Sequence, residues 1–380
     1  MTRVCKIANT DLASSMVVGT MKLVTDINTY KMLLPSNRNH TKLRFAGQNP
    51  FVYRFSMASE SRDDMNSAIR AIKTATEGDR FYPVKDDRYA LVALADAYGT
   101  DDIPAVAMGT EDYLYQADAE VYCLDPFFYS DAFTAFDSET LGDFSDVENA
   151  GDLATAPVIV YVGGRWDGSH LIASPNYSLY ESDHSTRIGS ICLVTEIHTD
   201  ENIIFEPLRN RITQKYTDLM TDDAKTQRDI ADFAGTPTYG NGYTKLTNEW
   251  IAYSFQSDYP LNEPPKLHAR LNPVGGDAQI WYQTEELDDW KAGPPIQPDI
   301  LTDYYFDGAA GAKEFTMIFQ SGSAGVDLYL YGIDITLRRW VPDDDIPVIE
   351  PGYSGSWTVE VAAGTALHMA GRYHDLYVRS

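Results

Sequence analysis

Cysteine is scarce in this chain of 380 residues, which contains only Cys5, Cys123 and Cys192. The three are far apart and odd in number, which argues against a disulfide framework and against a zinc cluster. Free cysteine is among the most buried residue types, so we expect three small core residues.

Long apolar runs are missing as well. No stretch of about 18 apolar residues is present, so the sequence predicts no membrane helix. The first residues hold a short apolar patch that Asp11 interrupts, and they do not read as a signal peptide. We therefore expect no insertion into a membrane.

Motifs of catalysis and metal binding are also lacking. The sequence has no HExxH, no HxH, no Cys/His pattern, no G-x-S-x-G and no phosphate-binding loop. Acidic pairs are too numerous for the two carboxylates of a glycosidase to be singled out. Asp343–Asp345 could offer oxygen ligands to Ca²⁺, although a solvated charged linker is the better interpretation. The sequence thus predicts neither an enzyme nor a cofactor.

Positive charge is low, and lysine is the scarcer cation. The chain has 12 Lys and 18 Arg against 39 Asp and 17 Glu, and its net charge is −26. Such a surface repels a nucleic-acid backbone, so we expect no specific nucleic-acid binding. Excess Asp and few Lys are what we expect in high salt, where screening removes self-repulsion. A halophilic host is our hypothesis, with a generally solvated acidic surface as the alternative.

Segments rich in aromatic and β-branched residues make up much of the sequence. Aromatics reach 12%, tyrosine alone numbers 25, and apolar residues make up 44% of the chain. This composition favours strands that bury a core. Short alternating or apolar segments predict strands at Leu43–Phe55 (two strands and a turn), Tyr89–Ala95, Tyr113–Leu124, Val158–Val162, Ser190–Ile197, Asn202–Pro207, Trp250–Phe255, Lys266–Leu271, Ala278–Thr284, Glu314–Ser321 and Val326–Trp340.

One segment has the pattern of a helix. Ser59–Thr74 begins with serines that can cap it, carries acids in its first turn, and repeats apolar residues at three- and four-residue spacing. Gly78 is expected to stop it. Arg209–Gly235 is polar, and the spacing of Ile212 and Tyr216 predicts one or two short helices or an ordered linker.

These elements divide the chain into four parts. We expect a first unit over residues 1–130, a second over 131–208 together with 346–380, a helical or linker segment over 209–242, and an inserted β-sandwich over 243–345. Residues 131–148 are acidic and are expected to form an exposed connection. The predicted fold class is mainly β: an N-terminal β-sandwich or split barrel with one helix, then two further sandwiches.

Three groups of residues carry a resemblance to a known family. A strand ends in a corner formed by Tyr122, Asp125, Pro126, Phe127, Tyr129 and Ser130, and the next unit opens with Asn149, Gly151, Pro157 and Val158. Near the end, Ile346–Val361 contains a P-G turn with Tyr353 where asparagine is usual. In this order the motifs resemble those of the distal tail proteins of long-tailed phages and related archaeal viruses.

That resemblance implies a structural role. Distal tail proteins form a ring, typically a hexamer, at the end of the tail tube, and contact the tube, the baseplate hub and fibre or receptor-binding proteins. Their second domain is a galectin-like sandwich. Inserted carbohydrate-binding modules are a known variation, and residues 243–342 are similar to jelly-roll modules of that kind. The resemblance therefore implies self-association in the virion and contact with host-surface glycans.

The aromatic residues of the predicted insert are the best candidates for a binding site. Trp250, Trp281, Tyr282 and Trp290 lie in it together with Trp340. Exposed aromatic rings pack on the C–H faces of sugars, while polar neighbours fix the hydroxyls. The alternative is that each tryptophan belongs to the core; Trp290, next to Asp288 and Asp289, is the one we expect to be exposed.

Two other functions stay open at this point. One is a carbohydrate-binding or carbohydrate-active sandwich that acts alone, as a monomer. The other is a secreted cellular adhesin, which would need an export signal.

Overall fold

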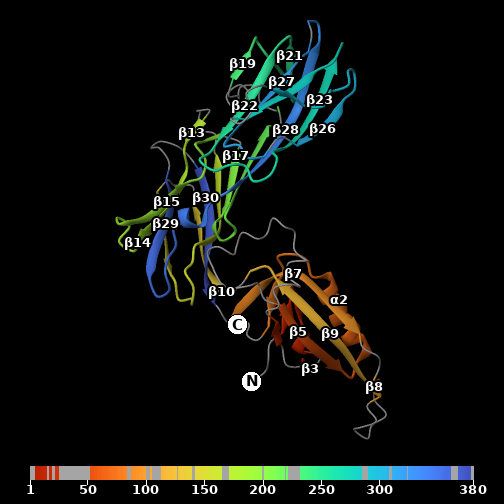
Figure 1. Cartoon of the computed structure of the whole chain (residues 1–380), viewed down its shortest axis with the longest axis vertical. Coiled ribbons are helices and arrows are strands. Elements are labelled where there is room, and N and C mark those ends of the chain that lie inside the picture. Colours follow the sequence, from red (N-terminus) through yellow and green to blue (C-terminus); the bar gives the residue numbers. More distant parts are fainter. Residues whose placement is uncertain are drawn as a thin grey trace.

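The computed structural model describes residues 5–14, 17–18, 22–24, 52–83, 87–99, 103–104, 113–125, 127–138, 142–164, 171–198, 201–218, 220, 232–284, 290–307, 310–322, 324–360 and 367–377. Over these ranges the chain is mainly β, in antiparallel sheets with a single α-helix, which confirms the predicted fold class. Figure 1 shows three β-rich units following one another along the long axis. Among the described residues, none of the helices has the length and apolar character needed to cross a membrane.

The first unit is built on three long strands. In the sheet, β9 (Tyr113–Cys123) lies between β5 (Val52–Ser59) and β7 (Arg88–Gly99). Shorter strands extend this framework: β1 (Lys6–Ile7), β2 (Thr10–Asp11), β3 (Val17–Val18), β4 (Lys22–Val24), β6 (Arg80–Tyr82) and β8 (Ile103–Pro104). A 3₁₀ turn, η1 (Leu12–Ser14), follows β2. Cys5 and Cys123 are buried in the core of this unit, as expected of free cysteines, whereas Cys192 is only partly buried, contrary to the prediction.

The helix forms where its sequence predicts. It is α2 (Arg62–Thr74), and the Ser61 side chain caps it by accepting a hydrogen bond from the Asp64 N–H at 3.2 Å. Met65, Ala68 and Ile72 are buried and pack against the sheet. The helix ends at Thr74, so Gly78 does not stop it. The expected strand and turn over 43–51 lie outside the described residues.

The second unit has two facing sheets. One runs β10 (Phe128–Ser138), β30 (Leu367–Tyr377), β12 (Pro157–Gly164), β17 (Glu201–Glu206) and β18 (Arg211–Asp218). The other runs β11 (Ser145–Glu148), β29 (Ser354–Glu360), β14 (Asn176–Glu181) and β15 (Arg187–Cys192). A small pair, β13 (Leu171–Ala173) and β16 (Glu196–His198), lies beside them. Trp357 is fully buried between the sheets, so the last two strands close the core that the middle of the chain begins.

The third unit is also a sandwich. Its first sheet contains β20 (Thr238–Gly240), β21 (Tyr243–Thr247), β28 (Asp327–Trp340), β23 (Lys266–Val274) and β26 (Thr302–Asp307). Its second sheet runs β19 (Asp232–Ala234), β22 (Trp250–Gln256), β27 (Glu314–Gln320), β24 (Gln279–Thr284) and β25 (Lys291–Ala292). A shared apolar core, with Ile251, Phe319 and Leu330 fully buried, joins the two sheets.

Long strands connect the units. β10 pairs with β7 of the first unit through Tyr129 and Ser130, and then with β30 of the second. β28 pairs with β21 and β23 over its first part and with β18 over the rest. The boundary expected at residue 130 therefore falls inside a strand.

Three sequence predictions are wrong in detail. The helices expected from Arg209 do not form over Arg211–Asp218, which is strand β18; only a 3₁₀ turn, η4 (Pro207–Arg209), precedes it. The acidic connection over 131–148 is largely strand, because β10 pairs with β30 from Phe133 to Ser138 and β11 pairs with β29. The single strand expected over Ser190–Ile197 divides into the end of β15 and the start of β16.

Candidate functional site

The outer face of the second sheet of the third unit carries two of the tryptophans. Alternate residues of a strand face opposite sides, and directly paired residues share a side. Trp250 of β22 pairs with Gln320 of β27, and Trp281 of β24 pairs with Ile318. Phe319, the residue between Ile318 and Gln320, is buried in the core. The two tryptophans therefore lie on one outward face, across the central strand from each other.

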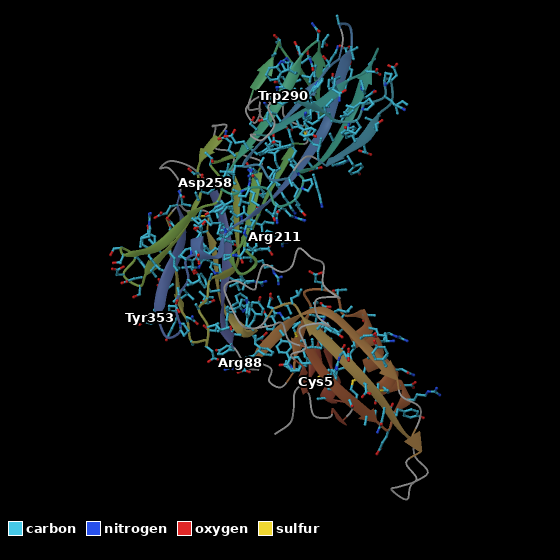
Figure 2. The ribbon with its side chains drawn as sticks, in the orientation of Figure 1. Cys5, Arg88, Arg211, Asp258, Trp290 and Tyr353 are labelled. Carbon is cyan, nitrogen blue, oxygen red and sulfur yellow. The ribbon has the colours of Figure 1, made fainter. Side chains whose placement is uncertain are left out.

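These side chains line a cavity of about 310 Å³, formed by Trp250, Trp281, Trp290, Ile318 and Gln320. Trp290 precedes β25, which pairs with β24 through Ala292 and Trp281, so the edge of the sheet brings the third indole to the other two. Trp290 is 38% exposed. Figure 2 places its label on the third unit. The five lining side chains carry no charge.

Hydrogen bonds within the protein occupy some of the polar atoms on this face. The Trp281 indole Nε1 is buried, and among the described residues it has no hydrogen-bond partner. Gln279 Nε2 donates to the Gly293 carbonyl at 2.8 Å, which ties β24 to the segment after β25. Ser254 and Thr316 hydroxyls lie 2.9 Å apart on the same face. The surface thus combines three indole rings with uncharged polar groups.

Tyr282 does not belong to this group. It follows Trp281 in the same strand and so faces the other way, where it packs against the core of the sandwich. Trp340 lies at the end of β28 and pairs with Arg211 of β18, so it does not line the cavity either. Of the four candidates, the structure brings together Trp250, Trp281 and Trp290 and leaves out Tyr282. Residues 285–289, which precede Trp290, lie outside the described residues.

Sequence reasoning missed the aliphatic and amide parts of the site. Ile318 and Gln320 lie at outward positions of the strand EFTMIFQ, whose burial alternates strictly. The alternation of this strand predicts that the Ile318 and Gln320 side chains point outward. It does not predict which strands pair with it, and that pairing places the two side chains between two tryptophans.

The corner residues form a second cluster, at the junction of the first two units. Asp125 is buried, and its Oδ2 accepts hydrogen bonds from the Tyr129 hydroxyl at 2.8 Å and from Arg209 Nη2 at 3.1 Å. Attraction to Asp125 raises the pKa of Arg209, and burial raises the pKa of Tyr129 well above its ordinary value. The corner is thereby bonded to η4 of the second unit. Pro126 lies outside the described residues.

The segment at Asn149 and the turn before Tyr353 are hydrogen-bonded to each other. The Asn149 N–H donates to the Tyr353 carbonyl at 3.0 Å, and the Gly352 N–H donates to the Asn149 carbonyl at 2.8 Å. Tyr353 takes part only through its backbone here, and its side chain is 68% exposed (Figure 2). The tyrosine side chain therefore has no part in these backbone bonds.

Several histidines and carboxylates of the described ranges form surface pairs. No group of three or more His, Cys, Asp and Glu side chains in them could hold a metal ion. His184 stacks on Phe144 and contacts Asp146, and His368 contacts Asp137, each on the surface. Asp343–Asp345 forms the 3₁₀ turn η5.

Comparisons with known proteins add little. No family model matches the sequence, and no curated protein is similar to it. Among solved structures, the chain is similar to a mutant of a family 29 carbohydrate-binding module, at 14% identity over 35% of this chain and 91% of that one, with a TM-score of 0.25. Another mutant of that module, complexed with cellulohexaose, matches at 16% identity over 36% and 98% of the two chains, also with a TM-score of 0.25. At such scores the likeness supports no argument about function.

Proposed function

We propose that this chain is a non-enzymatic glycan-binding protein whose third unit holds sugar rings against Trp250, Trp281 and Trp290. The cavity that the three indoles line carries the proposal. Sugar C–H faces pack favourably on aromatic rings, and a volume of about 310 Å³ lies in the range of small-molecule sites. The Gln320 amide, which lines the cavity, can both donate to and accept from sugar hydroxyls.

Binding of glycans to the full chain tests this proposal. Indole fluorescence on titration with a panel of soluble oligosaccharides should show saturable changes. Trp290→Ala, at the most exposed of the three rings, should weaken binding at least tenfold, because burying a large apolar side chain is worth about 1.5–3 kcal/mol. Trp281→Phe should weaken binding less, because it keeps a smaller aromatic ring at the same wall of the cavity.

Tyr305→Ala is the matched control. Tyr305 is 71% exposed and lies on the other sheet of the same unit, on β26. Its loss should leave the affinity unchanged. If Trp290→Ala binds every oligosaccharide as the unsubstituted chain does, the cavity is not the glycan site.

We also propose where such a protein works: as a distal tail protein, forming a ring at the tip of a viral tail between the tail tube and the baseplate or receptor-binding proteins. The specific support is the way the motif residues are used. Asp125 bonds the first unit to the second, and Asn149 bonds the opening of the second unit to the turn near the chain end. Asp125 therefore joins two units and Asn149 closes the second one, and a structural use of both residues suits a protein of assembly.

Mass measurement separates this role from that of a monomeric carbohydrate-binding protein. Light scattering and negative-stain imaging of the purified chain should show a closed ring, since head-to-tail contacts close when the rotation per subunit allows it. Trp290→Ala should assemble normally but adhere less to host cells. A chain that remains monomeric at high concentration and still binds glycan would favour the stand-alone function.

A further inference from the structure

The outward face of β22, β27 and β24 continues beyond the cavity of the three tryptophans. Ser254 of β22 and Gln283 of β24 both pair with Thr316 of β27, which lies two residues from Ile318 of the cavity. Alternate residues of a strand share a side, so these three side chains lie on the same face as the cavity. At about 3.4 Å per residue, Thr316 is about 7 Å from Ile318 along β27. Ser254, Thr316 and Gln283 thus form a polar row that borders the cavity.

The polar row combines hydrogen-bond donors with acceptors. Its three side chains are partly exposed. The Ser254 and Thr316 hydroxyls lie 2.9 Å apart, and a hydroxyl oxygen has two lone pairs with which to accept. The Gln283 amide has two N–H donors and an acceptor oxygen. This mixture suits sugar hydroxyls, because each of them both donates and accepts.

Charge is excluded from the cavity and the polar row on these three strands. The nine outward positions that pair across the strands are all neutral: Trp250, Ala252, Ser254, Gln320, Ile318, Thr316, Gln279, Trp281 and Gln283. In the whole chain, charged residues make up 23% and the net charge is −26. Lys291 of β25 pairs with Tyr282, so it faces the other way, and the next outward residue of β27 is the exposed Glu314. An anionic ligand would therefore meet an acid beyond the polar row and no cation on these strands.

Building on the glycan-binding role proposed above, we propose that this face binds an uncharged, linear oligosaccharide of three or more rings. The positions from Gln320 to Thr316 extend about 14 Å along β27, and β22 and β24 lie about 10 Å apart, so the face is longer than one sugar ring. The indoles pack on C–H faces in the cavity, and the polar row bonds the hydroxyls of the rings that follow. A β-linked chain with equatorial hydroxyls fits best, because its rings present flat C–H faces to the indoles.

A length series tests this proposal on the full chain. β-1,4-linked glucose oligomers of one to five rings are titrated into the protein at neutral pH and followed by calorimetry. The affinity should rise at least tenfold between one ring and four, because only the longer oligomers reach both the cavity and the polar row. Glucuronic acid oligomers of four rings should bind at least tenfold more weakly than the glucose oligomer of the same length.

Variants of the polar row separate it from the cavity. Thr316→Val and Gln283→Met keep the size of each side chain and remove its hydrogen bonds. Each should weaken binding of the four-ring oligomer about fivefold, the worth of one hydrogen bond, and should leave the two-ring oligomer unaffected. Trp290→Ala should weaken binding of every length. Thr336→Val, at a partly exposed position of β28 in the other sheet, is the matched control and should bind as the unsubstituted chain does.

The outcomes distinguish this proposal from the glycan-binding role itself. Equal affinity for one ring and four overturns the extended site, and equal affinity for the glucuronic acid oligomer overturns the choice of an uncharged ligand. If no glucose oligomer binds while another sugar binds in a way that depends on Trp290, this ligand class is wrong and the cavity is still a glycan site. If no sugar binds at all, both proposals fail.

Discussion

The side-chain amide of Asn149 donates a hydrogen bond of 2.8 Å to the carbonyl of Ile349, a residue 200 positions further along the chain. The same nitrogen donates to the Leu153 carbonyl at 2.8 Å, and Asn149 Oδ1 accepts from the Gly151 N–H at 3.0 Å. Thr155 and Ile349 complete the junction by exchanging two backbone hydrogen bonds. One buried asparagine thus holds the opening of the second unit to its closing segment, with the entire third unit between them in sequence.

Asn149→Ala should strongly destabilise the second unit. The substitution removes three hydrogen bonds. It leaves the Leu153 carbonyl and the Gly151 N–H without this partner, while the Ile349 carbonyl keeps its bond from the Thr155 N–H. At about 1 kcal/mol for each, the free energy of unfolding should fall by about 3 kcal/mol. Urea denaturation followed by tryptophan fluorescence, which reports on buried Trp357, measures this change.

Asn66→Ala is the control for that experiment. Asn66 is exposed on α2, where alanine is the better helix former, so its stability should change by less than about 0.5 kcal/mol. If Asn149→Ala unfolds at the same urea concentration as Asn66→Ala, the asparagine does not hold the junction.

Much of the fold could be predicted from local patterns. The cap at Ser61 and the apolar stripe of α2 place the helix within three residues of where it begins. β18 was missed because two of its inward residues are polar. Gln214 and Asp218 are buried beside Ile212 and Tyr216, so the alternation of burial is invisible in a hydrophobic pattern. Pairing with β28 makes this segment a strand, and the paired residues are more than 100 positions apart in the sequence.

The candidate site was predictable only in part. Strand alternation alone puts Trp281 and Tyr282 on opposite faces, so the tyrosine could have been left out from the sequence. To predict that Trp250 and Trp281 belong to one site, the strand order of the sheet must be known, because β27 lies between their strands. The register of β10 against β30 shifts after Tyr129, and no local pattern of residues 128–138 indicates that shift.

Asp125→Asn should be more costly than loss of a surface ion pair. Asp125 is 1% exposed, and the substitution leaves the Arg209 guanidinium, largely enclosed at the junction, without its counter-charge. Removing one partner of a buried pair costs about 3 kcal/mol, whereas exposed pairs contribute about 0.5 kcal/mol. Glu120→Gln is the comparison, because its partner Arg54 is 47% exposed and its own carboxylate is far less buried than that of Asp125. Thermal unfolding of both variants checks the order, and equal losses would contradict it.

Acid should destabilise the protein through His374. Burial lowers the pKa of this imidazole from 6.5 to about 4 in the folded chain. As the pH falls below 6.5, the unfolded chain takes up a proton that the folded one refuses, so stability is lost until about pH 4, by about 3 kcal/mol in all. His374→Gln keeps a donor for the Ser130 carbonyl but cannot titrate. The free energy of unfolding, measured with urea between pH 7 and 4, should therefore fall more steeply for the unsubstituted chain. If the two chains lose stability in parallel, His374 is not the cause.

Molar salt should stabilise this chain. With 56 acidic and 30 basic residues, at least 26 carboxylates lack a cation of the protein, and their repulsion opposes folding. The screening length falls from about 10 Å at 0.1 M salt to about 3 Å at 1 M, so most of that repulsion disappears.

The unfolding temperature should rise steadily between 0.1 and 2 M KCl. A triple variant, Glu60→Gln, Glu181→Gln and Glu314→Gln, removes three exposed charges and should gain less from the same salt, which separates screening from a general salting-out of apolar surface. An unfolding temperature that stays constant or falls over this range would remove the argument for a halophilic host.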